Sequence, residues 1–243
     1  MLRFKKQPLF YFVIISLVIP SFCFATVDRD IRVQDIRNKQ FELLSLDTPT
    51  SFGEAYDMAK IVAQKTKIRP AFLLAIFQQE LSLEKTDMCY LTDLQTGAGV
   101  RIIDGKQLQK VMKPERDIPD FLRITKALHK DPYKTAITCP MSFGWGGAMG
   151  PADFIPSTWA QYEKRIEDIT GAPANPWNTQ DAFWAAGLFL SDSGARSKNT
   201  KGEFDAAMIY FSGSAKSPYT FYAKGALAKE AVFASYIKTL EGK

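Results

Sequence analysis

The sequence predicts an α+β protein that is mainly α-helical, with a small β element around residues 88–110. Apolar residues recur at helical spacing along most of the chain, and capping and stop residues flank these segments. Glycine, threonine and β-branched residues gather in one central stretch. Of 243 residues, 46% are hydrophobic and 23% charged, which suits one globular domain with a sizeable core.

Two helices are expected in the first third of the chain. Ser51 followed by Glu54 is a capping box, and it starts a segment with a regular apolar stripe. Pro70 suits the first turn of a second helix, which includes "LLAIFQQELSLEK". Glu80 lies in that stretch on the same face as Leu73, Ile76, Phe77 and Leu83.

The remaining elements follow in order. The stretch "CYLTDLQTGAGVRIIDGKQL" predicts a short strand or hairpin with irregular loop, and "IPDFLRITKALHK" predicts a helix that stops before Pro132. A glycine-rich loop then enters a helix near Pro156, and another helix is capped around Asn178 and ended by Gly194. Two more helical segments complete the chain.

The N-terminus has the layout of a secretory signal peptide. A basic start precedes the short apolar run "YFVIISLVIP", and a small residue, Ala25, offers a cleavage site. We therefore divide the chain into a signal peptide (1–25), an N-terminal arm or linker (26–50) and one domain (51–243). An uncleaved membrane anchor is the alternative for the first segment.

Removal of that segment changes the charge and the cysteine count. It carries three cations and no acid, so the formal charge falls from +5 to about +2, and no nucleic-acid partner is expected. It also carries one of three cysteines, which leaves Cys89 and Cys139. An even pair in an oxidising compartment favours a disulfide, and two buried free thiols are the alternative.

The candidate chemistry reduces to carboxylates. With one histidine, His129 at a helix end, and two cysteines, ligands for a metal are few, and no phosphate-binding loop is present, so no metal or cofactor is expected. A glutamate on an apolar helix face is desolvated, which raises its pKa and lets it act as a general acid. On the helix pattern alone, Glu80 could equally be a surface residue at the rim of the stripe.

The glycine-rich loop "GWGGAMG" adds a second observation. Such a loop lets the backbone approach a ligand closely. Aromatic residues lie in or after it, and aromatic faces with glycines suit a carbohydrate groove; a tight turn with core aromatics is the alternative. These aromatic residues are Phe143, Trp145, Phe154, Trp159, Trp177, Trp184, Tyr210 and Phe211.

Four motifs in order resemble those of the lytic murein transglycosylases, in the branch of membrane-bound lytic transglycosylase B. "GGAMGPADFIPSTW" resembles the signature Gly-Ala-Met-Gly-x-x-Gln-Phe-x-Pro-Ser, and "QQE" resembles the segment of the catalytic glutamate. "NPWNTQDAFWAAGLFLSDSGA" and "AAMIYFSGS" are similar to two further segments. The likeness covers roughly residues 52 to 240, and a subgroup of the family has a cysteine in each stretch that contains Cys89 and Cys139.

The resemblance implies a lysozyme-like fold and cleavage of the β-1,4 bond between N-acetylmuramic acid and N-acetylglucosamine, with formation of 1,6-anhydro ends. Glu80 matches the family's single acid/base. Tyr210 matches the tyrosine that lines the site, and the loop that shapes the site matches Gly147, Ala148, Met149 and Gly150.

This chain departs from the family's pattern at three positions. Asp153 stands where the family has a glutamine near the substrate's N-acetyl group, so it is a candidate substrate-binding residue. Leu81 replaces a serine after the catalytic glutamate, and Phe211 replaces an asparagine after the tyrosine. Two alternatives follow: a glycan-binding protein that has lost its chemistry, and a muramidase-type hydrolase that uses Glu80 and Asp153 across a water molecule.

The expected partner is the peptidoglycan glycan strand, with cell-envelope machinery as an additional candidate partner. The chain is expected to be monomeric and to be exported to the periplasm or cell envelope.

Overall fold

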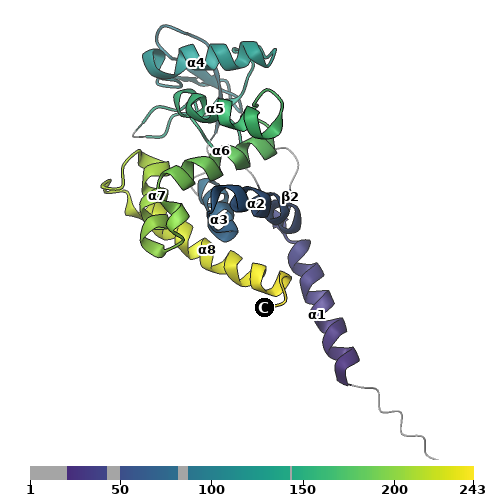
Figure 1. Cartoon of the computed structure of the whole chain (residues 1–243). Helices are drawn as coiled ribbons and strands as arrows, with labels where there is room; N and C mark the ends of the chain where they lie inside the picture. The colour runs from purple at the N-terminus through teal and green to yellow at the C-terminus, as the bar shows by residue number, and fades with distance from the viewer. Residues whose placement is uncertain (1–20, 43–49, 82–86, 143) are drawn as a thin grey trace, which may run out of the picture.

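The structure is a computed structural model that describes residues 21–42, 50–81, 87–142 and 144–243. The described residues form eight α-helices and two small antiparallel sheets, which confirms the mainly helical α+β class (Figure 1). The helices are α1 (Ser21–Arg37), α2 (Phe52–Thr66), α3 (Pro70–Glu80), α4 (Pro114–Ala127), α5 (Pro156–Thr170), α6 (Thr179–Asp192), α7 (Thr200–Ser212) and α8 (Thr220–Leu240), with a short 3₁₀ helix, η1, at Ala195–Ser197.

Local signals in the sequence start the helices where they were expected. Ser51 caps α2, its hydroxyl accepting the Glu54 N–H while the Glu54 carboxylate accepts the Ser51 N–H, so the capping box is confirmed. Pro70 occupies the first turn of α3, where its missing N–H costs nothing. The Asn178 side chain accepts the Asp181 N–H at the start of α6.

Helix α3 is the centre of a helical body that comprises α2, α3, α6, α7 and α8. Nine of its 11 residues are buried, because α2, α6 and α8 all pack against it. The ring of Phe77 stacks on Phe183 of α6, with ring centroids 4.3 Å apart. The sequence pattern had suggested a one-sided apolar stripe; the helix is instead enclosed on almost every side. Leu83, part of that expected stripe, lies outside the described residues.

A four-stranded antiparallel sheet forms the second region, in the order β5–β4–β3–β6. Three of its strands come from the β element expected around residues 88–110: β3 (Met88–Leu91), β4 (Gly99–Arg101) and β5 (Gln107–Leu108). The fourth, β6 (Ile137–Thr138), was not expected. In Figure 1 this sheet and α4 lie at one end of the molecule, and we call them the sheet region. Helix α5 contacts both α4 and α6 and so joins the two regions.

A disulfide joins Cys89 of β3 to Cys139, directly after β6, as the cysteine count had favoured. The two Cα atoms are 5.1 Å apart, and both cysteines are buried. The bond closes a loop across 50 positions, for which the chain-entropy model gives about 4 kcal/mol of stabilisation. It therefore fastens the edge strand β6, and the loop that follows it, to the rest of the sheet.

Residues 26–50, expected as an arm or linker, contain most of α1 and the strand β1 (Gln40–Phe41), which pairs with β2 (Thr50–Ser51) at the end of that range. Helix α1 projects from the helical body, and its end is held there by an ion pair between Arg37 and Asp57 at 2.6 Å (Figure 1). Ala25, the expected cleavage position, falls within α1, and residues 1–20 lie outside the described part. None of the described helices is long and apolar enough to cross a membrane.

Candidate functional site

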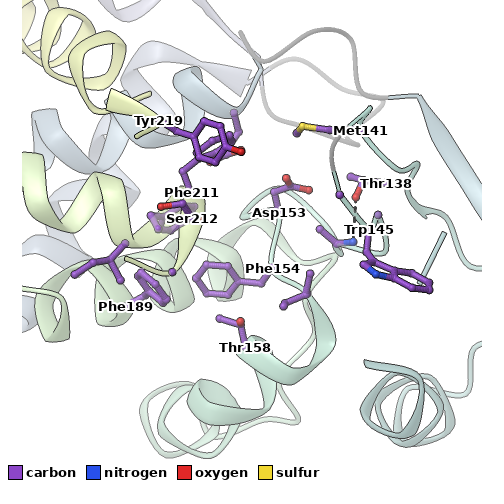
Figure 2. Close-up of a pocket in the computed structure, with 18 of the residues that line it drawn as sticks. Thr138, Met141, Trp145, Asp153, Phe154, Thr158, Phe189, Phe211, Ser212 and Tyr219 are labelled. Carbon is purple, nitrogen blue, oxygen red and sulfur yellow. Dashed lines mark hydrogen bonds between the residues drawn. The ribbon is translucent and has the colours of Figure 1, made fainter. Parts of the chain in front are cut away.

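A cavity of about 480 Å³ opens between the helical body and the sheet region (Figure 2). Its lining comes from segments far apart in the chain, including the end of α3, the glycine-rich loop and α7. The lining residues are Glu80, Arg116, Thr138, Cys139, Met141, Gly144, Trp145, Gly146, Ala148, Asp153, Phe154, Ile155, Thr158, Phe189, Ile209, Tyr210, Phe211, Ser212, Gly213 and Tyr219.

Glu80 is the last residue of α3 and is only 5% exposed. Its Oε1 accepts a hydrogen bond from the hydroxyl of Tyr222 on α8. Burial raises the pKa of Glu80 well above its ordinary value, and the nearby Asp153 carboxyl raises this pKa further, against a smaller lowering by the Tyr222 hydrogen bond. The helical body therefore holds a carboxyl group that keeps its proton to a higher pH than an ordinary glutamate does.

Asp153 sits in a tight turn formed by residues 149–154. The Met149 N–H donates to the Phe154 carbonyl at 2.9 Å, and the Asp153 N–H donates to the Gly150 carbonyl at 3.1 Å. Asp153 has a φ of 52°, a left-handed conformation that aspartate tolerates better than most residues. Its Oδ1 is buried and has no hydrogen-bond partner in the described part of the chain. Burial raises the pKa of Asp153 to about 7.

Tyr210 of α7 ties this turn to the helical body. Its hydroxyl donates to the carbonyl of Ala152, one residue before Asp153, at 2.5 Å. Its ring lies 5.2 Å from that of Phe154 and 5.1 Å from that of Phe189, centroid to centroid. Burial, then the charges on Glu80 and Asp153, raise the pKa of Tyr210 well above its ordinary value. Tyr210 therefore faces the cavity as a neutral phenol with both carboxyl groups nearby.

The four residues of the Gly-Ala-Met-Gly motif play different parts in the cavity wall. Ala148 lines it and is paired with Thr138, its N–H donating to the threonine hydroxyl at 3.0 Å. Met149 is fully buried behind the wall. Gly147 and Gly150 have positive φ values of 93° and 61°, and a Cβ on Gly150 would lie 1.8 Å from the Pro176 carbonyl oxygen. The backbone packing here excludes any side chain at Gly150.

The aromatic residues expected to form a groove divide into two sets. Trp145, Phe154, Tyr210 and Phe211 line the cavity, and Trp145 is 36% exposed. Trp159 and Trp184 are buried in the core, and Trp177 donates its indole N–H to the Ala136 carbonyl away from the cavity lining. For these three tryptophans the structure supports the alternative, packing in or against the core. Phe143 lies outside the described residues.

Sequence reasoning missed several residues of this site. Tyr222, which bonds Glu80, is 142 positions away from it, and no motif marks it. Arg116, in the first turn of α4, lines the cavity, and its guanidinium pairs with the buried Asp117 at 2.6 Å. Tyr219 and Met141 also line the cavity, and both lie higher than Asp153 in the view of Figure 2, one on each side of it. Only the fold brings these residues together, so spacing in the sequence carried no signal.

The described residues contain no group of three or more histidine, cysteine, aspartate or glutamate side chains that could hold a metal ion. The acidic groups in the cavity wall are the carboxyls of Glu80 and Asp153 and the phenols of Tyr210 and Tyr219. A carboxyl that keeps its proton near neutral pH can protonate a leaving oxygen. The site is therefore of a definite kind: a cavity lined by aromatic side chains that contains a candidate general acid, in a mainly helical α+β domain.

Comparisons with protein-family models, with curated proteins and with solved structures gave no match for this chain.

Proposed function

We propose that this chain is an exported lytic murein transglycosylase with a lysozyme-like fold, in the branch of membrane-bound lytic transglycosylase B. Its substrate is the peptidoglycan glycan strand, cut at the β-1,4 bond between N-acetylmuramic acid and N-acetylglucosamine. Glu80 is the single acid and base. The resemblance of four motifs in order supports the family, and the burial of Glu80 in a cavity supports its role.

The observation that carries this proposal is the state of Glu80. A carboxyl group at the end of an enclosed helix, with its pKa raised mainly by burial, is suited to deliver a proton at neutral pH. The cavity volume of about 480 Å³ is in the usual range for small-ligand sites. Aromatic side chains in its wall offer flat apolar surfaces for the faces of sugar rings.

The proposed reaction consumes no water. The Glu80 carboxyl gives its proton to the glycosidic oxygen, the bond from that oxygen to C1 of N-acetylmuramic acid breaks, and the N-acetylglucosamine portion leaves as an alcohol. The substrate's own acetamido oxygen stabilises the cationic C1. The Glu80 carboxylate then takes the proton of the 6-hydroxyl group, whose oxygen bonds to C1 and closes the 1,6-anhydro ring. Glu80 ends the cycle protonated, as it began.

The test is a digest of purified peptidoglycan with the protein, followed by mass spectrometry of the released muropeptides. Muropeptides with 1,6-anhydro ends are the expected product. Reducing ends, each heavier by one water, contradict a transglycosylase. If no product forms while the protein still sediments with the glycan, the chain is a binding protein on this fold and the proposed activity is wrong.

One observation favours a second candidate function. Asp153 lies in the same cavity as Glu80 and has an unpartnered carboxyl oxygen, so the two groups could serve as acid and base of a muramidase-type hydrolase. An inverting hydrolase of this kind leaves room for a water molecule between carboxyls about 6.5–9.5 Å apart. Reducing ends in the digest are the result that this alternative predicts.

A further inference from the structure

Three titratable side chains from three segments line the cavity: Glu80 of α3, Asp153 of the turn of residues 149–154 and Tyr210 of α7. A fourth, Tyr222 of α8, is not part of the lining and is joined to them through Glu80. Tyr222 bonds Glu80 directly, and Tyr210 bonds the residue before Asp153. Glu80 and Tyr222 are buried, Asp153 and Tyr210 are half-buried, and the charges on the two carboxyls act on both phenols. The cluster therefore has to be treated as one electrostatic unit.

No positively charged side chain of the described residues pairs with this cluster. Neither Glu80 nor Asp153 has an ion-pair partner within the described ranges. Arg116, the one cation among the described lining residues, has its Nε and Nη2 bound to Asp117 at 2.9 and 2.6 Å. On α8, the Lys229 ammonium binds Gln79 Oε1 at 2.8 Å, not Glu80. Within the part of the chain that the structure describes, two negative charges in the cavity would therefore have no cation paired with them.

The two carboxyls differ in their contacts. Glu80 accepts a hydrogen bond from the Tyr222 hydroxyl, whereas Asp153 Oδ1 is buried and finds no partner among the described residues. Figure 2 shows the Asp153 side chain projecting into the cavity space. An isolated buried carboxyl in a pocket shared with a second acid has one strong physical effect on its neighbour: its charge opposes ionisation there. This effect depends on the position of Asp153 in the turn and not on any contact with a substrate.

We infer that Asp153 is a positioning residue for the catalytic proton: the pair carries a single proton in the working enzyme, and the negative charge on Asp153 keeps that proton on Glu80. This inference rests on the proposed function, since it assigns Glu80 as the acid. It adds to that function a built-in control of the pH range in which the enzyme works.

The direction of the pKa shifts agrees with this order of ionisation. Burial alone raises the pKa of Asp153, to about 7, whereas both burial and the Asp153 charge raise that of Glu80. As pH rises, Asp153 ionises first, and Glu80 then holds its proton to a higher pH than burial alone would achieve. When Glu80 gives up its proton to the leaving oxygen, the pair briefly carries two charges. That repulsion favours recapture of a proton from the 6-hydroxyl group.

The test compares the protein with its Asp153→Asn variant by ¹³C NMR titration of carboxyl carbons, with the Glu80 signal assigned from Glu80→Gln. Asparagine keeps the shape and tolerates the left-handed backbone at position 153, so the variant should fold. The expected result is that the titration midpoint of Glu80 falls by about one pH unit or more. The matched control is Asp168→Asn, which removes an equal charge from an exposed residue outside the cavity and should leave the midpoint unchanged.

A Glu80 midpoint that stays the same or rises in Asp153→Asn overturns the inference, and so does a wild-type titration in which Glu80 ionises before Asp153. The measurement needs no turnover, so it is separate from the digest. Absence of anhydro products with a lowered midpoint would refute the transglycosylase and leave the proton arrangement standing. Anhydro products with an unchanged midpoint would support the transglycosylase and refute the proton arrangement.

Discussion

The helical body and the sheet region hold their parts of the site by different means. The body encloses α3 on almost every side, and this packing alone removes the carboxyl of Glu80 from water. The sheet region has strands of only two to four residues, and a disulfide and turns at positive-φ glycines hold it in shape. The comparison teaches that the acid depends on core packing, whereas its neighbour Asp153 depends on the conformation of a tight turn between the two regions and on the Tyr210 hydrogen bond to that turn.

The largest expected effect is on the helical side. Glu80→Gln keeps the shape and removes the proton donor, and loss of a general acid costs about 10²–10⁴-fold in rate. We expect anhydro-muropeptide formation, followed by mass spectrometry over time, to fall by that factor or to vanish. Glu167→Gln, on α5 outside the cavity lining, is the control and should match the wild type. Full activity of Glu80→Gln would show that the acid has been assigned to the wrong residue.

The next largest effect is expected from removal of the disulfide in the sheet region. Replacing both Cys89 and Cys139 by serine should lower the free energy of unfolding by about 4 kcal/mol, because the open chain gains the entropy of a loop closed across 50 positions. Urea denaturation measures the change. Amide hydrogen exchange should speed up in β3, β6 and the following loop while α3 stays protected. Uniform loss of protection in both regions would contradict the separate roles given to them.

Asp153 should cost stability as pH rises. Its pKa in the folded protein is raised to about 7 from an ordinary value of 3.8, so the stability it contributes is present at low pH and is lost as the pH rises through about 7. The Asp153→Asn variant has no such charge. Its free energy of unfolding relative to the wild type should therefore rise by roughly a few kcal/mol between pH 4 and pH 8. Thermal unfolding of both proteins across this range checks it. Parallel curves would mean that the folded protein does not perturb Asp153.

A smaller effect concerns stability at two glycines, one where a side chain would clash with the backbone and one where only the backbone conformation disfavours a side chain. Gly150 and Gly213 both have left-handed backbone, with φ of 61° and 72°. A Cβ on Gly150 meets the Pro176 carbonyl, whereas one on Gly213 has nothing within 4 Å. Gly213→Ala should cost about 1 kcal/mol from the conformation alone. Gly150→Ala should cost clearly more and should also slow glycan cleavage, since the turn carries Asp153. Equal unfolding free energies for the two variants would contradict this.

The smallest expected effect concerns the hydrogen bond from Tyr222 of α8 to Glu80. The Tyr222 hydroxyl lowers the pKa of Glu80, so Tyr222→Phe should raise it. The alkaline limb of the pH–rate profile then moves to higher pH, opposite to the movement expected for Asp153→Asn. Tyr133→Phe, an exposed residue outside the cavity lining, serves as the control. A shift of Tyr222→Phe toward lower pH would show that the hydroxyl stabilises the protonated acid.

Much of this arrangement could be predicted where the signal is local. The capping box at Ser51, the cap at Asn178, the β element after residue 88 and the disulfide all follow from neighbouring residues or from a count of cysteines. Strand β6 could not be predicted, because two residues carry no alternation. Glu80 was ambiguous because periodicity describes one face of a helix, and α3 has almost no exposed face.

The site shows the same division between local and long-range information. Asp153 and Tyr210 were expected from their motifs, and both line the cavity with Glu80. Tyr222 was not, since α8 packs against α3 only in the folded chain. The tryptophans at positions 159, 177 and 184 could not be assigned to a groove or to the core from the sequence, because an aromatic residue suits either place.

The measurement that bears most directly on the central claim is digestion of peptidoglycan in water enriched in ¹⁸O, with immediate borohydride reduction of the products. Transfer of the Glu80 proton followed by closure of the anhydro ring uses no water. We therefore predict new N-acetylmuramic acid ends that are anhydro and free of the heavy isotope. One ¹⁸O atom in each new end would show that water attacks C1, and it would contradict the account of Glu80 as the single acid and base.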